Sequence, residues 1–173
     1  MDIEPDTKDW TWVLDRACPE CGFAAGDYSR ASIGDEVRSA ASAWTSELSR
    51  PDATIRIRAD RWSVLEYACH VRDVFRIFHQ RLHLMLTEDD PAFPDWDQDE
   101  TATTDCYELQ EPAVVGIELL DAAEVLGDRF DAVVGAQWER TGRRSDGSTF
   151  SVATLGTYMI HDPIHHLWDV SAR

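Results

Sequence analysis

Apolar residues recur every three or four positions in four segments of the chain, a spacing typical of amphipathic helices. The segments begin after Ser32, near Trp62, at Pro112 and near residue 151, and the second and fourth run to about residues 87 and 171. Four helices of this length in one small domain predict an all-α fold, a four-helix bundle.

Residues at the helix ends sharpen these boundaries. Ser32 is expected to cap the first helix with its hydroxyl while Asp35 reaches back, and Pro51 lies just beyond its end. Pro112 suits the first position of the third helix, and Gly135 suits its end.

The remaining segments connect or precede the helices. Residues 1–31 are predicted to form an irregular N-terminal extension packed on a core domain of residues 32–173. The acidic stretch 88–111 is longer than typical helix connections, so we expect a long loop between the second and third helices. Residues 136–150 look like an extended hairpin segment that turns at Ser145, Asp146 and Gly147.

The charge of the chain excludes some partners. The 173 residues include 16 Lys and Arg against 33 Asp and Glu, a net charge of −17. This balance argues against nucleic acids and anionic membrane surfaces, which bind through basic residues. Residues 1–9 carry no apolar run of a secretory signal, and no run of about 18 apolar residues follows. We therefore expect a cytoplasmic protein whose cysteines are thiols or metal ligands.

The segment YMIHDPIHHLWDV, residues 158–170, carries the most informative pattern. His161 and His165 are four residues apart, or about 40° around a helix, so both imidazoles can reach one metal ion. His166 is rotated by about 100° from His165 and is not expected to share that ion. Periodicity alone leaves open that the pair simply faces solvent.

A divalent ion needs a third ligand, and the second helix offers two choices. His79 and His83 form a second pair at the edge of the apolar stripe, where a solvated surface pair is favoured. His70 lies at the border of the apolar arc and is the better candidate, although a buried structural histidine is an equal alternative. Asp73, one turn further, is a candidate acceptor to orient an imidazole.

Two motifs together resemble a known family. The stretch Trp62-Ser-x-x-Glu-Tyr-x-x-His70 and the later His161-x-x-x-His165-His166 look like the DinB-like superfamily of metal-binding four-helix bundles, in an actinobacterial type. That superfamily is related to mycothiol-dependent maleylpyruvate isomerase. The resemblance implies that His70, His161 and His165 are the metal ligands, with further positions left to water or a substrate thiol.

The resemblance also implies a reaction class. A divalent metal, zinc or nickel first, would activate a low-molecular-weight thiol such as mycothiol, or water, against a small electrophile, giving a transferase or isomerase. Tyr158, Asp73 and Asp162 are the nearby groups expected to move protons. The alternative is a non-catalytic metal-binding or stress-response protein of the same fold, and a bundle without metal is a third. An apolar face left on the first or third helix would allow a homodimer.

The extension carries a further motif, Cys18-Pro-Glu-Cys21-Gly. Such a motif is half of a zinc knuckle, which needs two more ligands, and Cys69 and Cys106 are not spaced as a second pair. Three interpretations stay open: an inert pair, a metal site completed by other residues, or a redox dithiol.

Overall fold

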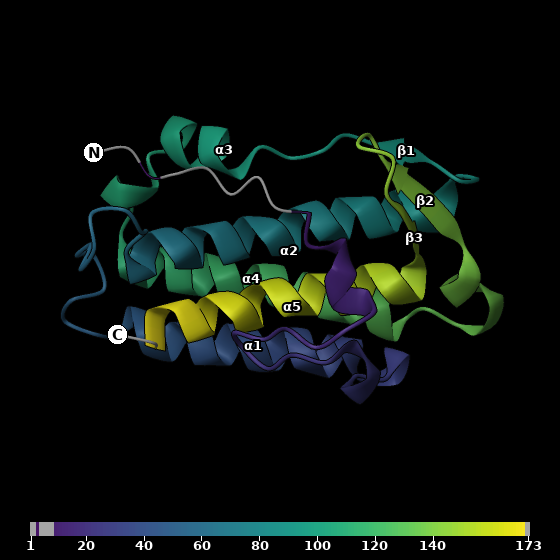
Figure 1. Cartoon of the computed structure of the whole chain (residues 1–173), viewed down its shortest axis with the longest axis horizontal. Helices are drawn as coiled ribbons and strands as arrows, with labels where there is room; N and C mark the ends of the chain where they lie inside the picture. Colours follow the sequence, from purple (N-terminus) through teal and green to yellow (C-terminus); the bar gives the residue numbers. More distant parts are fainter. Residues whose placement is uncertain (1–2, 4–8, 172–173) are drawn as a thin grey trace.

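Four long helices lie side by side and form the body of the molecule (Figure 1). The structure is a computed structural model that describes residue 3 and residues 9–171. The long helices are α1 (Ile33–Leu48), α2 (Val64–Thr87), α4 (Pro112–Asp131) and α5 (Val152–Ser171). Short 3-10 helices span Thr11–Leu14, Ala25–Asp27, Arg30–Ser32, Tyr107–Leu109 and Gly135–Glu139. The predicted four-helix bundle is confirmed.

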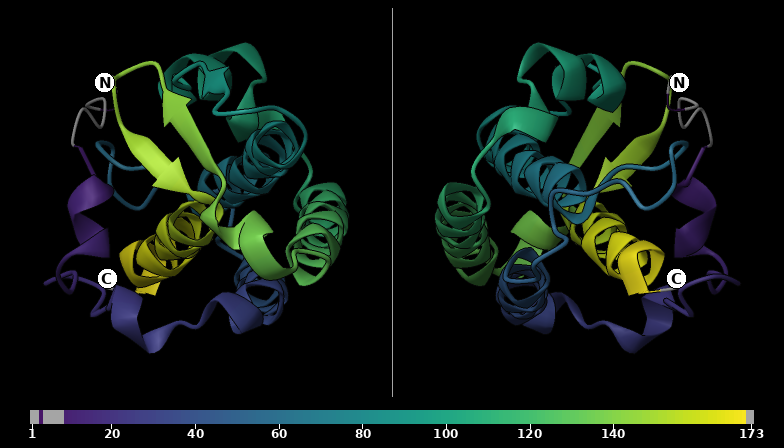
Figure 2. Two further views of the ribbon diagram at one scale, coloured as in Figure 1. Left: turned by 90° about the vertical axis from the view of Figure 1, so that its right-hand side faces the viewer. Right: turned by 90° about the vertical axis from the view of Figure 1, so that its left-hand side faces the viewer.

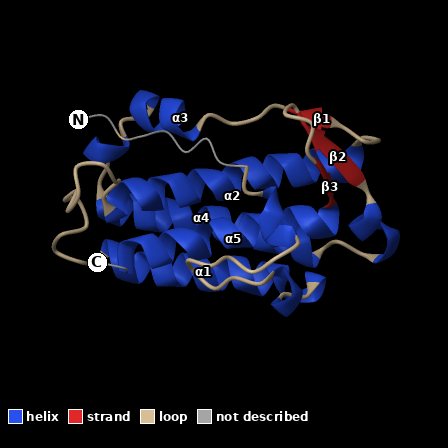
Figure 3. Cartoon of the chain, viewed as in Figure 1, coloured by secondary structure: helices blue, strands red, loops and turns tan. Residues whose placement is uncertain are grey.

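A small sheet closes one end of the bundle (Figure 3). Its strands, β1 (Ala92–Phe93), β2 (Thr141–Arg144) and β3 (Thr149–Ser151), are ordered β1-β2-β3. Strands β2 and β3 pair antiparallel, and Gly147, with a φ of 96°, lies in the turn between them. The hairpin predicted before the last helix is therefore present.

Two predicted helix boundaries were wrong. The hydroxyl of Ser32 does not cap α1; it donates to the carbonyl of Ser29, 2.9 Å away. Helix α4 ends at Asp131, four residues before Gly135, and Gly135 instead begins the following 3-10 helix. The capping box belongs instead to α2, where the Ser63 side chain accepts from the Glu66 amide and Glu66 accepts from the Ser63 amide.

The acidic segment 88–111, predicted from its length to be a long loop, is a long connection that contains short ordered elements. It contains β1, the short helix α3 (Gln98–Thr104) and a 3-10 helix. Asp97 caps α3 by accepting from the Glu100 amide at 2.8 Å, and Trp96 donates to Thr101 at 2.7 Å. Local hydrogen bonds of this kind order the segment and hold Trp96 in place against α2.

The N-terminal segment packs along α5 (Figure 2). Val13, Cys18 and Phe23 are buried in the same apolar core as the helices. Residues 1–2 and 4–8 of the predicted extension lie outside the described residues.

The outer faces of the helices bear on two expectations, the absence of a membrane-spanning helix and the predicted homodimer. Among the helices of the described residues, none combines the length and the apolar character needed to cross a membrane. Helix α4 exposes Val114, Ile117, Leu120 and Val125. A homodimer through this face stays a prediction.

A buried ionic network joins α2 to the segment before α4. Asp73 accepts from the Arg72 guanidinium at 3.0 and 2.9 Å and from the Tyr107 hydroxyl at 2.6 Å. Burial would raise the pKa of Asp73, but the hydrogen bonds from Arg72 and Tyr107 lower it below 3.8. The carboxylate is therefore ionised at neutral pH and neutralises a guanidinium that is only 4% exposed.

We expect Asp73→Asn to lower the free energy of unfolding by about 2 kcal/mol at pH 7, because it removes the buried one of two carboxylates that pair with Arg72 and leaves only Glu118, at 2.8 Å and 40% exposed. The folded pKa of Asp73 lies below its unfolded value, so its contribution is complete above the unfolded pKa. It is lost as the pH falls through the folded pKa. Urea unfolding between pH 7 and pH 4 should show a constant difference that begins to narrow only at the acid end. Asp60→Asn, in the exposed pair with Arg58, is the control and should change nothing measurable.

Candidate metal centres

Helix α5 presents metal-ligating side chains on two different faces. On one face, Asp162 and His166 meet His70 of α2, and their ligating atoms all lie within 4.8 Å of one another. On the other face, His161 and His165 meet two cysteines of the N-terminal segment within the same distance. The structure thus brings together two members of the predicted set, His161 and His165, and places His70 in the other group.

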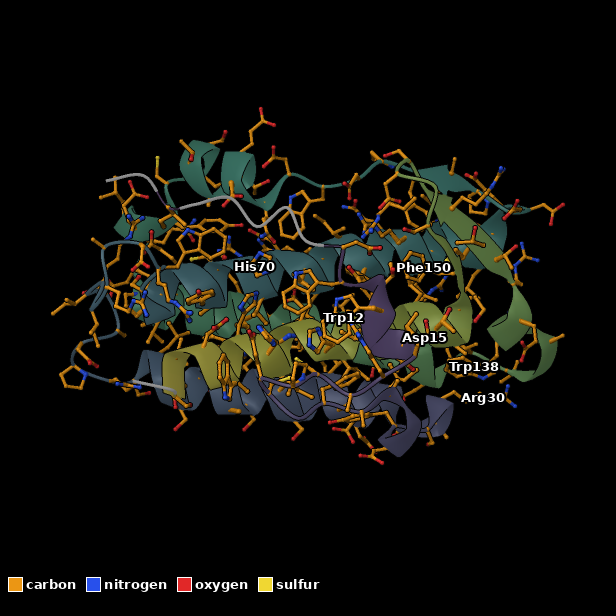
Figure 4. All side chains as sticks on the ribbon, in the orientation of Figure 1. Trp12, Asp15, Arg30, His70, Trp138 and Phe150 are labelled. Carbon is orange, nitrogen blue, oxygen red and sulfur yellow. The ribbon has the colours of Figure 1, made fainter. Side chains whose placement is uncertain are left out.

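Asp162 lies at the centre of the first group. Its Oδ2 is 3.2 Å from Nε2 of His70 and 3.9 Å from Nε2 of His166. Its Oδ1 is buried and has no hydrogen-bond partner among the described residues, and the same holds for Nδ1 of His70. Two imidazoles and one carboxylate therefore converge here, and Oδ1 of the carboxylate has no hydrogen bond among the described residues. Figure 4 labels His70 on the face of α2 that looks toward α5.

A second carboxylate orients His166. The Nδ1 of His166 lies 2.9 Å from Oδ2 of Asp169, which is held in turn by Arg61 at 2.8 Å. This contact turns Nε2 of His166 toward Asp162, which is the arrangement that metal-binding histidines commonly have. The sequence analysis separated His166 from the ion of His165 but did not assign His166 as a ligand, and it missed Asp169, which is spaced three residues after His166 on one helix face.

Aromatic rings surround the first group. Trp96 stacks on His70 with ring centroids 5.2 Å apart and planes 5° apart, and Trp62 lies 5.5 Å away. Tyr67 lies 4.7 Å from His166. His70 is completely buried, whereas the Asp162 side chain is 30% exposed. The group is therefore shielded on most sides but stays accessible from one.

The electrostatics of the first group favour a charged carboxylate. Burial would raise the pKa of Asp162, but the nearby imidazoles of His70 and His166 lower it to about 2. At neutral pH the group offers one negative charge together with imidazole nitrogens. This donor set of hard oxygen and borderline nitrogen suits zinc and related divalent ions.

The second group consists of Cys18, Cys21, His161 and His165. Burial, and then the charge of His165, lower the pKa of His161 to about 4, so its imidazole is neutral at pH 7. Burial raises the pKa of Cys21 to about 11. A reactive redox dithiol requires a lowered pKa, so this environment argues against the redox interpretation.

The other predicted residues lie outside both groups. Asp73 is bound to Arg72, Arg76 and Tyr107, and it makes no hydrogen bond to an imidazole among the described residues. Tyr158 lies one helical turn before Asp162 on α5, and its hydroxyl is 3.3 Å from a guanidinium nitrogen of Arg144. Of the two histidines predicted to form a solvated surface pair on α2, His83 is exposed and 3.2 Å from Arg129, whereas His79 is half-buried.

Comparison with known proteins identifies the family. The model of the DinB superfamily matches residues 34–170, so the chain belongs to that superfamily. The match begins after the segment that carries Cys18 and Cys21.

Two relatives carry related descriptions. A protein of Halalkalibacterium halodurans, named "Putative metal-dependent hydrolase BH0277", is 29% identical over 130 residues, 72% of this chain and 72% of that protein. YfiT of Bacillus subtilis, described as "a probable metal-dependent hydrolase with an unusual four-helix bundle topology", is similar in structure. Its TM-score is 0.61 at 18% identity, over 99% of this chain and 93% of YfiT. This likeness supports the fold.

Proposed function

We propose that the chain is a metal-dependent enzyme that holds a divalent ion with His70, Asp162 and His166. The observation that carries this proposal is the convergence of Nε2 of His70, Oδ2 of Asp162 and Nε2 of His166, with Oδ1 of Asp162 buried and unpaired. The relatives' descriptions as metal-dependent hydrolases support it.

The ligand set favours water as the nucleophile. Two histidines and one carboxylate are the protein ligands of several hydrolytic zinc enzymes, which keep a further position open. An ion held this way lowers the pKa of a bound water or thiol toward neutrality. The aromatic rings of Trp62, Tyr67 and Trp96 limit the entry of bulk water, and the exposed edge of Asp162 leaves a path for a small substrate.

A thiol is the second candidate nucleophile. The resemblance to mycothiol-dependent maleylpyruvate isomerase supports a low-molecular-weight thiol that attacks a small electrophile, by transfer or isomerisation. The two reactions use the same ligands and differ in what occupies the open position. Zinc and nickel both fit imidazole and carboxylate donors.

Substitutions of the ligands test the site. We expect His166→Ala and Asp162→Asn to weaken metal binding at this site by at least about 100-fold, because each removes a donor whose orienting contacts alone are worth about 10–100-fold. Hydrolysis of activated esters, amides and lactones by the metal-loaded protein should fall with the metal. His79→Ala, on the same helix α2 as His70 but outside both groups of ligands, is the matched control and should keep both properties.

The same assays separate the alternatives. Turnover of a thiol with an electrophile, and not of the esters, would assign the thiol reaction. Tight metal binding without either turnover would assign the non-catalytic alternative. Binding of a metal without sulfur ligands that survives both ligand substitutions would contradict the proposed site.

Asp169→Asn tests the orientation of His166. The variant keeps the shape of the side chain but weakens the acceptor for Nδ1 of His166, so metal affinity at the first site should fall by about 10–100-fold. Titration of chelator-treated protein with zinc measures this loss. Asp121→Asn, on the exposed face of α4, is the control. An unchanged affinity in Asp169→Asn would show that the Asp169 contact does not support the ligand.

A further inference from the structure

Four side chains from opposite ends of the chain meet on the face of α5 that the proposed enzyme site does not use. The Cys18 and Cys21 sulfurs and one ring nitrogen each of His161 and His165 all lie within 4.8 Å of one another. Two thiolates and two imidazoles are a complete tetrahedral ligand set for structural zinc. More than 130 residues separate the two pairs in sequence, so only the fold brings them together.

The backbone of the cysteine segment has the shape of a tight metal-binding turn. The Cys18 amide donates to the Phe23 carbonyl at 2.8 Å, and the Gly22 amide donates to the Cys18 carbonyl at 3.0 Å. Gly22 has a φ of 77°, a left-handed conformation that residues with a Cβ atom rarely adopt. The turn presents both sulfurs to the same pair of histidines.

The surroundings of each histidine leave it suited to bind a metal ion, in a different way for each. The Nδ1 of His165 lies 3.6 Å from the Cys18 sulfur, while its Nε2 lies 3.3 Å from a carboxylate oxygen of Glu20. Glu20 stands between the two cysteines, so the turn that supplies the sulfurs also holds the far side of the imidazole. The Nε2 of His161 is buried and has no hydrogen-bond partner among the described residues.

Three of the four ligands are buried, and Cys21 is partly exposed. Cys18 is 2% exposed, His161 4% and His165 6%. The Trp10 ring lies 4.8 Å from His165, and the Phe23 ring lies 5.2 Å from His161. Two thiolates would neutralise the charge of a zinc ion, which lowers the desolvation cost of burying it. A closed site with four protein ligands is structural, since catalytic zinc keeps an open position.

We propose that Cys18, Cys21, His161 and His165 bind one structural zinc ion that fastens the N-terminal segment to α5. In residues 9–31, the continuously described part of this segment, the chain forms only short 3-10 helices, and its fully buried apolar residues are Val13, Cys18 and Phe23. Figure 4 shows Trp12 and Asp15 in this segment, in front of α5. The ion would fix the same helix that carries Asp162 and His166, while remaining separate from the site formed with His70.

Zinc content and coordination test this proposal directly. In protein purified without a chelator or a His-tag, zinc X-ray absorption should detect sulfur ligands at about 2.3 Å together with nitrogen ligands at about 2.0 Å. Cys18→Ser and Cys21→Ser should each lose about one equivalent of zinc. Cys106→Ser, which changes an exposed cysteine outside both groups, should lose none.

A second measurement on the unaltered chain guards against misfolded variants. Arg16 is exposed in the fastened segment, and trypsin cleavage after it should become at least tenfold faster when a thiol-reactive mercurial releases the zinc. His166→Ala should keep the sulfur-ligated zinc, and Cys18→Ser should keep the sulfur-free site, so either site can fail alone. Zinc without sulfur ligands, unchanged zinc in both cysteine variants, or a Cys18–Cys21 disulfide detected by mass would overturn the proposal.

Discussion

The rotation of about 100° per residue along α5 is the constraint on which the rest of the site depends. Residues four apart share a face, and neighbours do not. His161 and His165 therefore face the N-terminal segment, whereas Asp162 and His166 face α2. A single His-rich sequence becomes two separate groups of ligands because different parts of the chain pack on the two faces.

The two groups differ in the chemistry they support. The first has one carboxylate on a partly exposed side chain, two imidazoles and surrounding aromatic rings, which suits an ion with an open position. The second has two thiols and two imidazoles under the cover of Trp10 and Phe23. Because both groups sit on one helix, whatever fixes α5 against the N-terminal segment also fixes Asp162 and His166 relative to His70.

Most of the fold could be predicted from the sequence because apolar periodicity, Pro112 and the turn at Gly147 act locally. The partition of the histidines could not. The spacing correctly separated His166 from His165, but it could not show that α2 reaches the face of Asp162 while the cysteine turn reaches the face of His161. The position of Trp96 beside His70 could not be predicted either. The acidic composition of its segment gave no sign of the capped helix α3, which orders that segment.

The most direct test is an anomalous difference map from a crystal of the zinc-loaded protein, collected on both sides of the zinc absorption edge. The account predicts two peaks, one among His70, Asp162 and His166 and one among Cys18, Cys21, His161 and His165. A single peak held by His70, His161 and His165 would contradict it and restore the ligand set that the family resemblance implies.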